Sequence, residues 1–155
     1  MIAATLGTLA LVSASFAQQG AFGTADEAKA MLQKAVAAVK ADKAKALDMI
    51  ATGEGGFHDR DLYPYCFNLS DGTLYPFSNP NLKAVFGKDY RTLKDPKGFN
   101  FGQVIFDAVT QKPEGQISEV SGIMLPKPGS DPTPVPKTVF AIKVGDLGCG
   151  VGYYN

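Results

Sequence analysis

The chain has 155 residues, about the size of a single domain. Its 45% hydrophobic and 19% charged residues are typical of a globular protein and exclude a disordered or fibrous chain. Fifteen basic and fifteen acidic residues leave no net charge to attract nucleic acid or an anionic membrane, so we expect no nucleic acid partner. Two cysteines and one histidine cannot supply a four-ligand zinc site by themselves, and we expect neither a metal nor another cofactor.

The first residues have the features of a secretory signal. Residues 2–12 are small and apolar, and Ser15 and Ala17 are the small residues that a signal peptidase site requires. This run is shorter than the roughly 20 residues of a membrane-spanning helix. No basic residue follows the initiator methionine, so a buried N-terminal helix is the alternative. We expect residues 1–17 to be cleaved and residues 18–155 to form one periplasmic or secreted domain.

The mature chain begins with a helical pattern. Thr24 and Glu27 have the spacing of a capping box, which satisfies free amides in the first turn of a helix. Apolar residues then recur at steps of three, four or seven, while most lysines lie outside that stripe. We therefore expect one amphipathic helix of about 25 residues, which ends at Gly53 and the glycines that follow it.

The rest of the sequence reads mainly as strands. Two apolar segments flank Asp71 and Gly72, which predicts a hairpin, and Pro64 predicts an edge or a bulge in its first strand. The expected elements are strands at 62–69 and 74–77, a loop at 78–98, a helix at 99–110, and strands at 117–125, 135–144 and 147–154. This order predicts an α+β domain with one mainly antiparallel sheet.

A series of short motifs runs through nearly the whole mature chain. They are GGFHDRDLY at 55–63, NLSDG at 68–72, NPNL at 79–82, GKD at 87–89, LKD at 93–95 with Gly98, PKPG at 126–129, PK at 136–137 and GVGYY at 150–154. No single motif is specific, but their ordered series resembles the single Cache domain family, type 2. These are extracytoplasmic sensor domains of bacterial chemoreceptors and histidine kinases. The resemblance implies a long N-terminal helix on a PAS-like five-stranded antiparallel sheet. It also implies a pocket for a small organic acid between the sheet and a loop-helix segment.

The chain departs from the family pattern at several places. Phe77 stands where many members have a histidine, and residues 121–125 are mainly aliphatic where an aromatic residue is often found. Residues 83–85 lengthen the loop before Gly87. Receptors of the family continue into a transmembrane helix, whereas this sequence stops at Asn155. We therefore expect the domain to act through a partner such as a membrane receptor or a histidine kinase.

The candidate pocket residues combine aromatic walls with a cation. Tyr63, Tyr65 and Phe67 share one face of the first strand, and two of them carry hydroxyl donors. Lys137 matches the family's Pro-Lys motif and is the first candidate to bind a carboxylate, with Arg91 as the second. The alternatives are an ordinary aromatic core and an edge lysine that deters strand pairing. The residues expected to contact the ligand are Tyr63, Tyr65, Phe77, Arg91, Phe101, Met124 and Lys137.

The remaining polar and sulfur-containing residues have structural interpretations. His58 is favoured as a solvated loop residue because no nucleophile motif accompanies it, and we expect no enzyme activity. The resemblance implies that Asp59, Arg60 and Asp61 help to hold the end of the long helix, and a surface charge cluster is the alternative. In a PAS-like order Cys66 and Cys149 fall on neighbouring strands, so export favours a disulfide, and two buried thiols are the alternative.

Two function classes follow from these expectations. The first is an exported sensor domain that binds a small organic acid. The alternative is a structural or interaction module with the same fold and a collapsed, ligandless pocket, which Phe77 and residues 121–125 favour.

Overall fold

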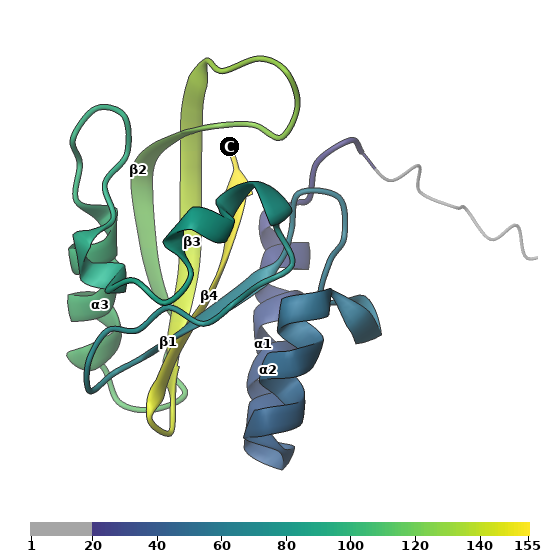
Figure 1. The fold of residues 1–155 in the computed structure, drawn as a ribbon, viewed down its shortest axis with the longest axis vertical. Coiled ribbons are helices and arrows are strands. Elements are labelled where there is room, and N and C mark those ends of the chain that lie inside the picture. The colour runs from purple at the N-terminus through teal and green to yellow at the C-terminus, as the bar shows by residue number, and fades with distance from the viewer. Residues whose placement is uncertain (1–19) are drawn as a thin grey trace, which may run out of the picture.

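A computed structural model describes residues 20–155, so the expected signal peptide lies outside the described residues. The helices and strands, in chain order, are α1 (Ala25–Ala41), α2 (Lys43–Thr52), β1 (Pro64–Asn68), α3 (Phe101–Thr110), β2 (Ser118–Pro126), β3 (Pro134–Val144) and β4 (Leu147–Tyr154) (Figure 1). Three short 3₁₀ helices are η1 (Glu54–Gly56), η2 (Pro80–Val85) and η3 (Tyr90–Thr92). The domain is α+β, as the order of sequence patterns predicts.

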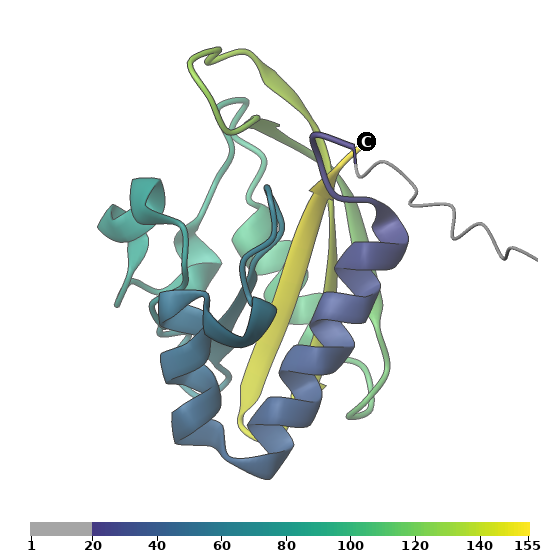
Figure 2. The same ribbon diagram turned by 90° about the vertical axis from the view of Figure 1, so that its right-hand side faces the viewer.

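The four strands form one antiparallel sheet in the order β1-β4-β3-β2. Helix α1 packs on β4 and β3, and α3 packs on β2 and β3. Figures 1 and 2 show that α1 and α3 cover opposite faces of the sheet. The inner strand β3 is accordingly buried from Lys137 to Ile142. Because both faces of the sheet are covered, a cavity can be enclosed between the sheet and one of its covering layers.

The expected single N-terminal helix is wrong in its length. The capping box forms as predicted, because Thr24 accepts a hydrogen bond from the backbone of Glu27 and the Glu27 carboxylate accepts one from Thr24. The helix then breaks at Asp42, whose backbone is extended (φ −158°, ψ 99°). The Asp42 carboxylate accepts a hydrogen bond from the Lys45 amide and caps α2, a role that short acidic side chains favour over a helix interior. The two helices meet at an angle in Figure 2, and α2 ends at Gly53 as expected.

The expected five-stranded sheet is also wrong, because the second arm of the predicted hairpin is not a full strand. The turn itself forms: the Asn68 amide donates to the Thr73 carbonyl at 2.9 Å, and Leu74 makes an isolated bridge to Phe67. The arm then turns to the loop, where the Leu74 amide donates to Lys88. Pro76, which has no amide hydrogen, follows two residues later and stops further pairing.

The other expected elements are confirmed with small changes in their bounds. The helix at 99–110 and the three C-terminal strands appear as α3, β2, β3 and β4. The structure joins Cys66 of β1 to Cys149 of β4 by a disulfide, and these residues are direct cross-strand partners. No helix within residues 20–155 is both long and apolar enough to cross a membrane.

Candidate functional site

Two cavities that share lining residues lie beside the sheet, and the inner one is covered by η2, η3 and the first residue of α3. The inner cavity has a volume of about 190 Å³ and the outer cleft about 500 Å³. Both are lined by Tyr63, Leu82, Leu125 and Lys137, so these four residues surround the junction between them. The inner volume is below the roughly 300–1,000 Å³ of pockets for drug-sized ligands, which indicates a small occupant.

The inner cavity has mainly apolar walls contributed by the sheet and by the loop-helix segment. Side chains from the sheet are Tyr65, Ile123 and Val139, and those from the opposite wall include Phe77, Val85, Leu93 and Phe101. The residues that lengthen the loop, 83–85, are used here, because they extend η2 and Val85 reaches the cavity. Such walls suit the hydrocarbon part of a ligand.

Lys137 supplies a buried positive charge at the junction. Its side chain is only 6% exposed, and it forms no ion pair with any residue of the described chain. The ammonium nitrogen lies 4.5 Å from the ring centroid of Tyr154 and 5.6 Å from that of Tyr63. Aromatic faces stabilise a cation in part but provide no anion. A buried lysine in this state favours the binding of an anionic group beside it.

Glycines of β4 create the space that these side chains occupy. A Cβ on Gly152 would lie 2.5 Å from Cε of Lys137, and one on Gly150 would lie 2.7 Å from the hydroxyl oxygen of Tyr65. The alternating glycines therefore form a shallow track on β4 along which neighbouring long side chains lie flat. The motif at 150–154 therefore shapes the site through the absent side chains of its glycines, and its last residue, Tyr154, lines the outer cleft.

Two tyrosine hydroxyls form a polar pair in the inner cavity. The hydroxyl oxygens of Tyr65 and Tyr90 are 2.6 Å apart, and both residues line the cavity. Burial is the largest cause that raises the pKa of each phenol well above its ordinary value, so both stay neutral. One proton joins the two oxygens, which leaves the other hydroxyl proton available for a ligand oxygen.

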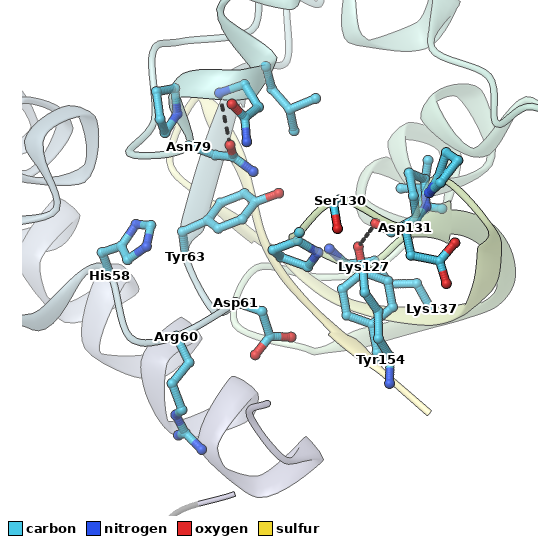
Figure 3. Close-up of a pocket in the computed structure, with 18 residues that line it drawn as sticks. His58, Arg60, Asp61, Tyr63, Asn79, Lys127, Ser130, Asp131, Lys137 and Tyr154 are labelled. Atoms are coloured by element: carbon cyan, nitrogen blue, oxygen red, sulfur yellow. Dashed lines mark hydrogen bonds between the residues drawn. The ribbon is translucent and has the colours of Figure 1, made fainter. Parts of the chain in front are cut away.

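The outer cleft is more polar than the inner cavity (Figure 3). Figure 3 shows Asp61 and Lys137 reaching it from different segments, with Tyr63 and Tyr154 beside them. Burial chiefly, and then the neighbouring Tyr63 and Asp61, raise the pKa of Tyr154, whose hydroxyl donates to the Pro126 carbonyl at 2.5 Å. The loop from 126 to 132 forms one wall of this cleft.

The segment before β1 anchors the N-terminal end of α1. Arg60 pairs with Glu27 at 2.8 Å and with Asp59 at 2.7 Å, and it also donates to the carbonyls of Gly20 and Phe22. This contact holds the first turn of α1, which agrees with the anchoring role that the resemblance implies. His58 is exposed, and its ring nitrogen Nδ1 lies 2.9 Å from Oγ of Ser78.

Five of the seven expected ligand contacts line the inner cavity: Tyr63, Tyr65, Phe77, Phe101 and Lys137. Arg91 and Met124 line neither cavity. Arg91 is held by Asp89 at 2.7 Å and lies over the ring of Phe106. Met124 alternates with two cavity residues, Ile123 and Leu125, so its side chain belongs to the other face of the strand. We therefore leave both out of the proposed site.

Sequence reasoning missed three residues of the site: Tyr90, Asp61 as a cleft residue, and Tyr154. Tyr90 lies in the expected loop at 78–98, where no periodic pattern of apolar residues predicts which side chains are buried. The sequence motif predicts only helix anchoring for Asp61. Asp61 lies in a tight turn closed by hydrogen bonds between Asp59 and Leu62, and no periodic pattern indicates which way its side chain points. Among residues 20–155, no three His, Cys, Asp or Glu side chains are grouped as a metal site requires.

Comparisons with known proteins identify the fold. No family model and no curated protein matches the chain. Among solved structures, a Cache chemosensory domain that recognises carboxylic acids is 22% identical, with a TM-score of 0.60 over 83% of this chain and 91% of that one. A periplasmic sensor domain of a chemotaxis protein is 21% identical (TM-score 0.57, 83% and 88%). A methyl-accepting chemotaxis protein from Vibrio parahaemolyticus is 23% identical (TM-score 0.61, 83% and 86%). The chain therefore has the fold of a single Cache sensor domain.

Proposed function

We propose that this Cache-fold chain is an extracytoplasmic sensor domain that binds a small organic acid, and that it belongs to the type 2 group of single Cache domains. The observation that carries the proposal is Lys137, a buried cation without an ionic partner among the described residues. It lies where an apolar cavity meets a polar cleft. A carboxylate at this junction provides the missing anion.

The two cavities suggest how such an acid is oriented. Its hydrocarbon part fills the inner cavity against side chains such as Phe77 and Val139, while its carboxylate faces Lys137. The spare hydroxyl proton of the Tyr65–Tyr90 pair donates to a ligand oxygen or to a water that bridges to it. The similarity in fold to a domain that recognises carboxylic acids agrees with this orientation.

The experiment compares small acids with their neutral amides in thermal unfolding. Propanoate and 3-methylbutanoate have nearly the same shape as propanamide and 3-methylbutanamide but carry a negative charge. We expect at least one acid to raise the unfolding temperature of the mature protein, because a ligand that binds only the folded state stabilises it, and we expect its amide to have little effect. If no acid shifts unfolding at millimolar concentration, or if the amide is as effective as the acid, the proposal is wrong.

The competing function is an interaction module without a ligand. Phe77 favours it, since its ring stacks on Tyr63 with centroids 5.3 Å apart and occupies space near the junction. The open inner volume of about 190 Å³ argues against a collapsed pocket. The thermal comparison separates the two functions, because an interaction module gains no stability from either member of a pair.

The proposal includes export and a signalling partner. Cleavage after Ala17 delivers the domain to the periplasm or the exterior, where it presents its bound state to a membrane receptor or histidine kinase. Intact-mass measurement of protein from the native host tests the export step. A mass that begins at Gln18 supports it, whereas a retained N-terminal segment contradicts it.

A further inference from the structure

We propose that the ligand is a zwitterion, an α-amino acid with an apolar side chain, whose ammonium group binds Asp61 while its carboxylate binds Lys137. This inference rests on the proposed function and narrows its ligand class. It starts from a second buried charge in the outer cleft that the binding of a simple acid does not use.

Asp61 is a buried carboxylate with one oxygen unpaired. Its side chain is 2% exposed. Oδ1 accepts a hydrogen bond from the Gly23 amide at 2.6 Å, whereas Oδ2 is buried and has no hydrogen-bond partner within residues 20–155. A buried carboxylate oxygen without a donor is unfavourable, and such groups usually bind a partner, a water or a ligand. Oδ2 is therefore a position for an N–H donor.

Asp61 and Lys137 carry opposite charges, line the same cleft and form no ion pair with each other. Lys137 lies over two tyrosine rings instead. Two buried, oppositely charged groups that stay apart in one cavity fit a molecule that carries both complementary charges.

The other charged groups of the cleft are either paired or less buried. Arg60 binds Glu27 and Asp59. The Lys127 ammonium lies 4.3 Å from the ring centroid of Phe22, but Lys127 is only half-buried. Asp131 accepts a hydrogen bond from the Thr133 amide in its own turn. Within the described part of the cleft this leaves Asp61 and Lys137 as the buried charges whose ionic partners are missing.

The geometry of an α-amino acid matches three features of the site. Carboxylate, ammonium and side chain diverge from one carbon atom. Lys137, at the junction, corresponds to the carboxylate, and Asp61, which lines only the outer cleft, corresponds to the ammonium group. The apolar inner cavity, which opens from the same junction, corresponds to the side chain. The inner cavity thus accepts the side chain, and its small volume favours one of the size of alanine to leucine.

The test uses ligands that differ only in the amino group: alanine and propanoate, valine and 3-methylbutanoate, leucine and 4-methylpentanoate. Calorimetric titration of the mature protein should show the best amino acid binding about tenfold to a hundredfold more tightly than its deaminated partner, the scale of a hydrogen bond to a charged group. Asp61→Asn should abolish that preference. It should bind the deaminated acid at least as well as the wild type, because a nearby negative charge is removed.

Two controls make the result specific. Asparagine keeps the oxygen that accepts from Gly23, so Asp61→Asn should fold, and thermal unfolding checks this. Asp59→Asn removes a charge two residues away that does not line the cleft, and it should retain the preference. The inference is overturned if deaminated acids bind as tightly as the amino acids, or if Asp61→Asn keeps the preference; in both cases the proposed function stands. If no member of either series binds, the proposed function fails as well.

Discussion

Gly152 shows how an absent side chain positions the proposed anchor. It pairs with Val139 in the sheet and lies under the aliphatic part of Lys137. Since its φ is not in the left-handed region, an alanine is compatible with the backbone, and the added methyl group conflicts mainly with the flexible end of Lys137. Side-chain displacement, rather than backbone strain, is therefore the expected effect of substitution.

We predict that Gly152→Ala weakens acid binding by about tenfold, which corresponds to about 1.4 kcal/mol, with little change in stability. Displacement of the ammonium group from the junction is the physical reason. Calorimetric titration measures the affinity, and Gly20→Ala is the control, because its Cβ meets only the Phe22 carbonyl at 3.7 Å. Unchanged affinity in Gly152→Ala would show that the position of Lys137 does not matter for binding.

The Tyr65–Tyr90 pair gives a second prediction at this scale. Tyr90→Phe leaves the buried Tyr65 hydroxyl without its partner at 2.6 Å and should reduce the free energy of unfolding by about 1–3 kcal/mol. The double variant Tyr65→Phe with Tyr90→Phe replaces both partners by apolar groups, so it should recover part of that loss. Urea unfolding of the wild type, Tyr65→Phe, Tyr90→Phe and the double variant provides the values. If the double variant loses as much free energy of unfolding as the two single variants together, the two hydroxyls are not hydrogen-bonded to each other.

At the scale of single residues, the sequence predicts the direction of side chains in strands, because successive side chains of a strand point to opposite faces of the sheet. Tyr65 of β1 and Tyr63, which directly precedes that strand, both line the inner cavity as expected, and Lys137 is in the expected strand. The charge of Arg91 predicts a ligand contact there, but its neighbour Tyr90 is the residue that lines the cavity. In a loop, the direction of each side chain depends on tertiary hydrogen bonds such as that from the Tyr90 amide to the Gly72 carbonyl. No periodic pattern encodes this.

Among the elements, the break between α1 and α2 depends on one polar side chain. Asp42→Ala removes the hydrogen bond to the Lys45 amide and should destabilise the domain by about 1 kcal/mol, a typical N-cap value. Asp48→Ala is the matched control, since Asp48 is an exposed aspartate of the same helix. Denaturant unfolding compares the two. Equal effects of both substitutions would argue that the cap has no special role.

The disulfide couples the first strand to the last. Cys66 and Cys149 are separated by 83 residues, and both are buried. We predict that mature protein has no titratable thiol when denatured without reductant. Replacement of both cysteines by alanine should reduce stability by up to about 4–5 kcal/mol, the upper value of the chain-entropy model. Two reactive thiols in protein purified from an oxidising compartment would contradict the bridge.

The elements also show where sequence patterns stop being informative. The apolar stripe continues through Asp42, so periodicity alone predicts one helix, whereas the local cap decides for two. The arm after Gly72 is apolar enough for a strand, yet it is divided between the edge of the sheet and the loop near Lys88. In both places a few local hydrogen bonds outweigh the pattern of hydrophobicity.

For the whole molecule, the sheet and its two covering layers create the cavity that the proposed function needs. Helix α1 covers one face of the sheet, and the inner cavity of the candidate site lies on the other, between the sheet and the segment that contains η2, η3 and α3 (Figure 1). The order of elements predicts the α+β class from sequence. The size of the cavity follows from how individual side chains pack across that face, which the order of elements does not determine.

The most direct test of the account is the affinity of Lys137→Met for an acid that stabilises the wild type. Methionine keeps most of the apolar volume and removes the charge, so calorimetry should show binding about tenfold to a hundredfold weaker. The matched control is Lys143→Met, because Lys143 is in the same strand but lines neither cavity, and it should bind as the wild type does. Equal affinity of Lys137→Met and the wild type would contradict the claim that this buried cation binds the ligand carboxylate.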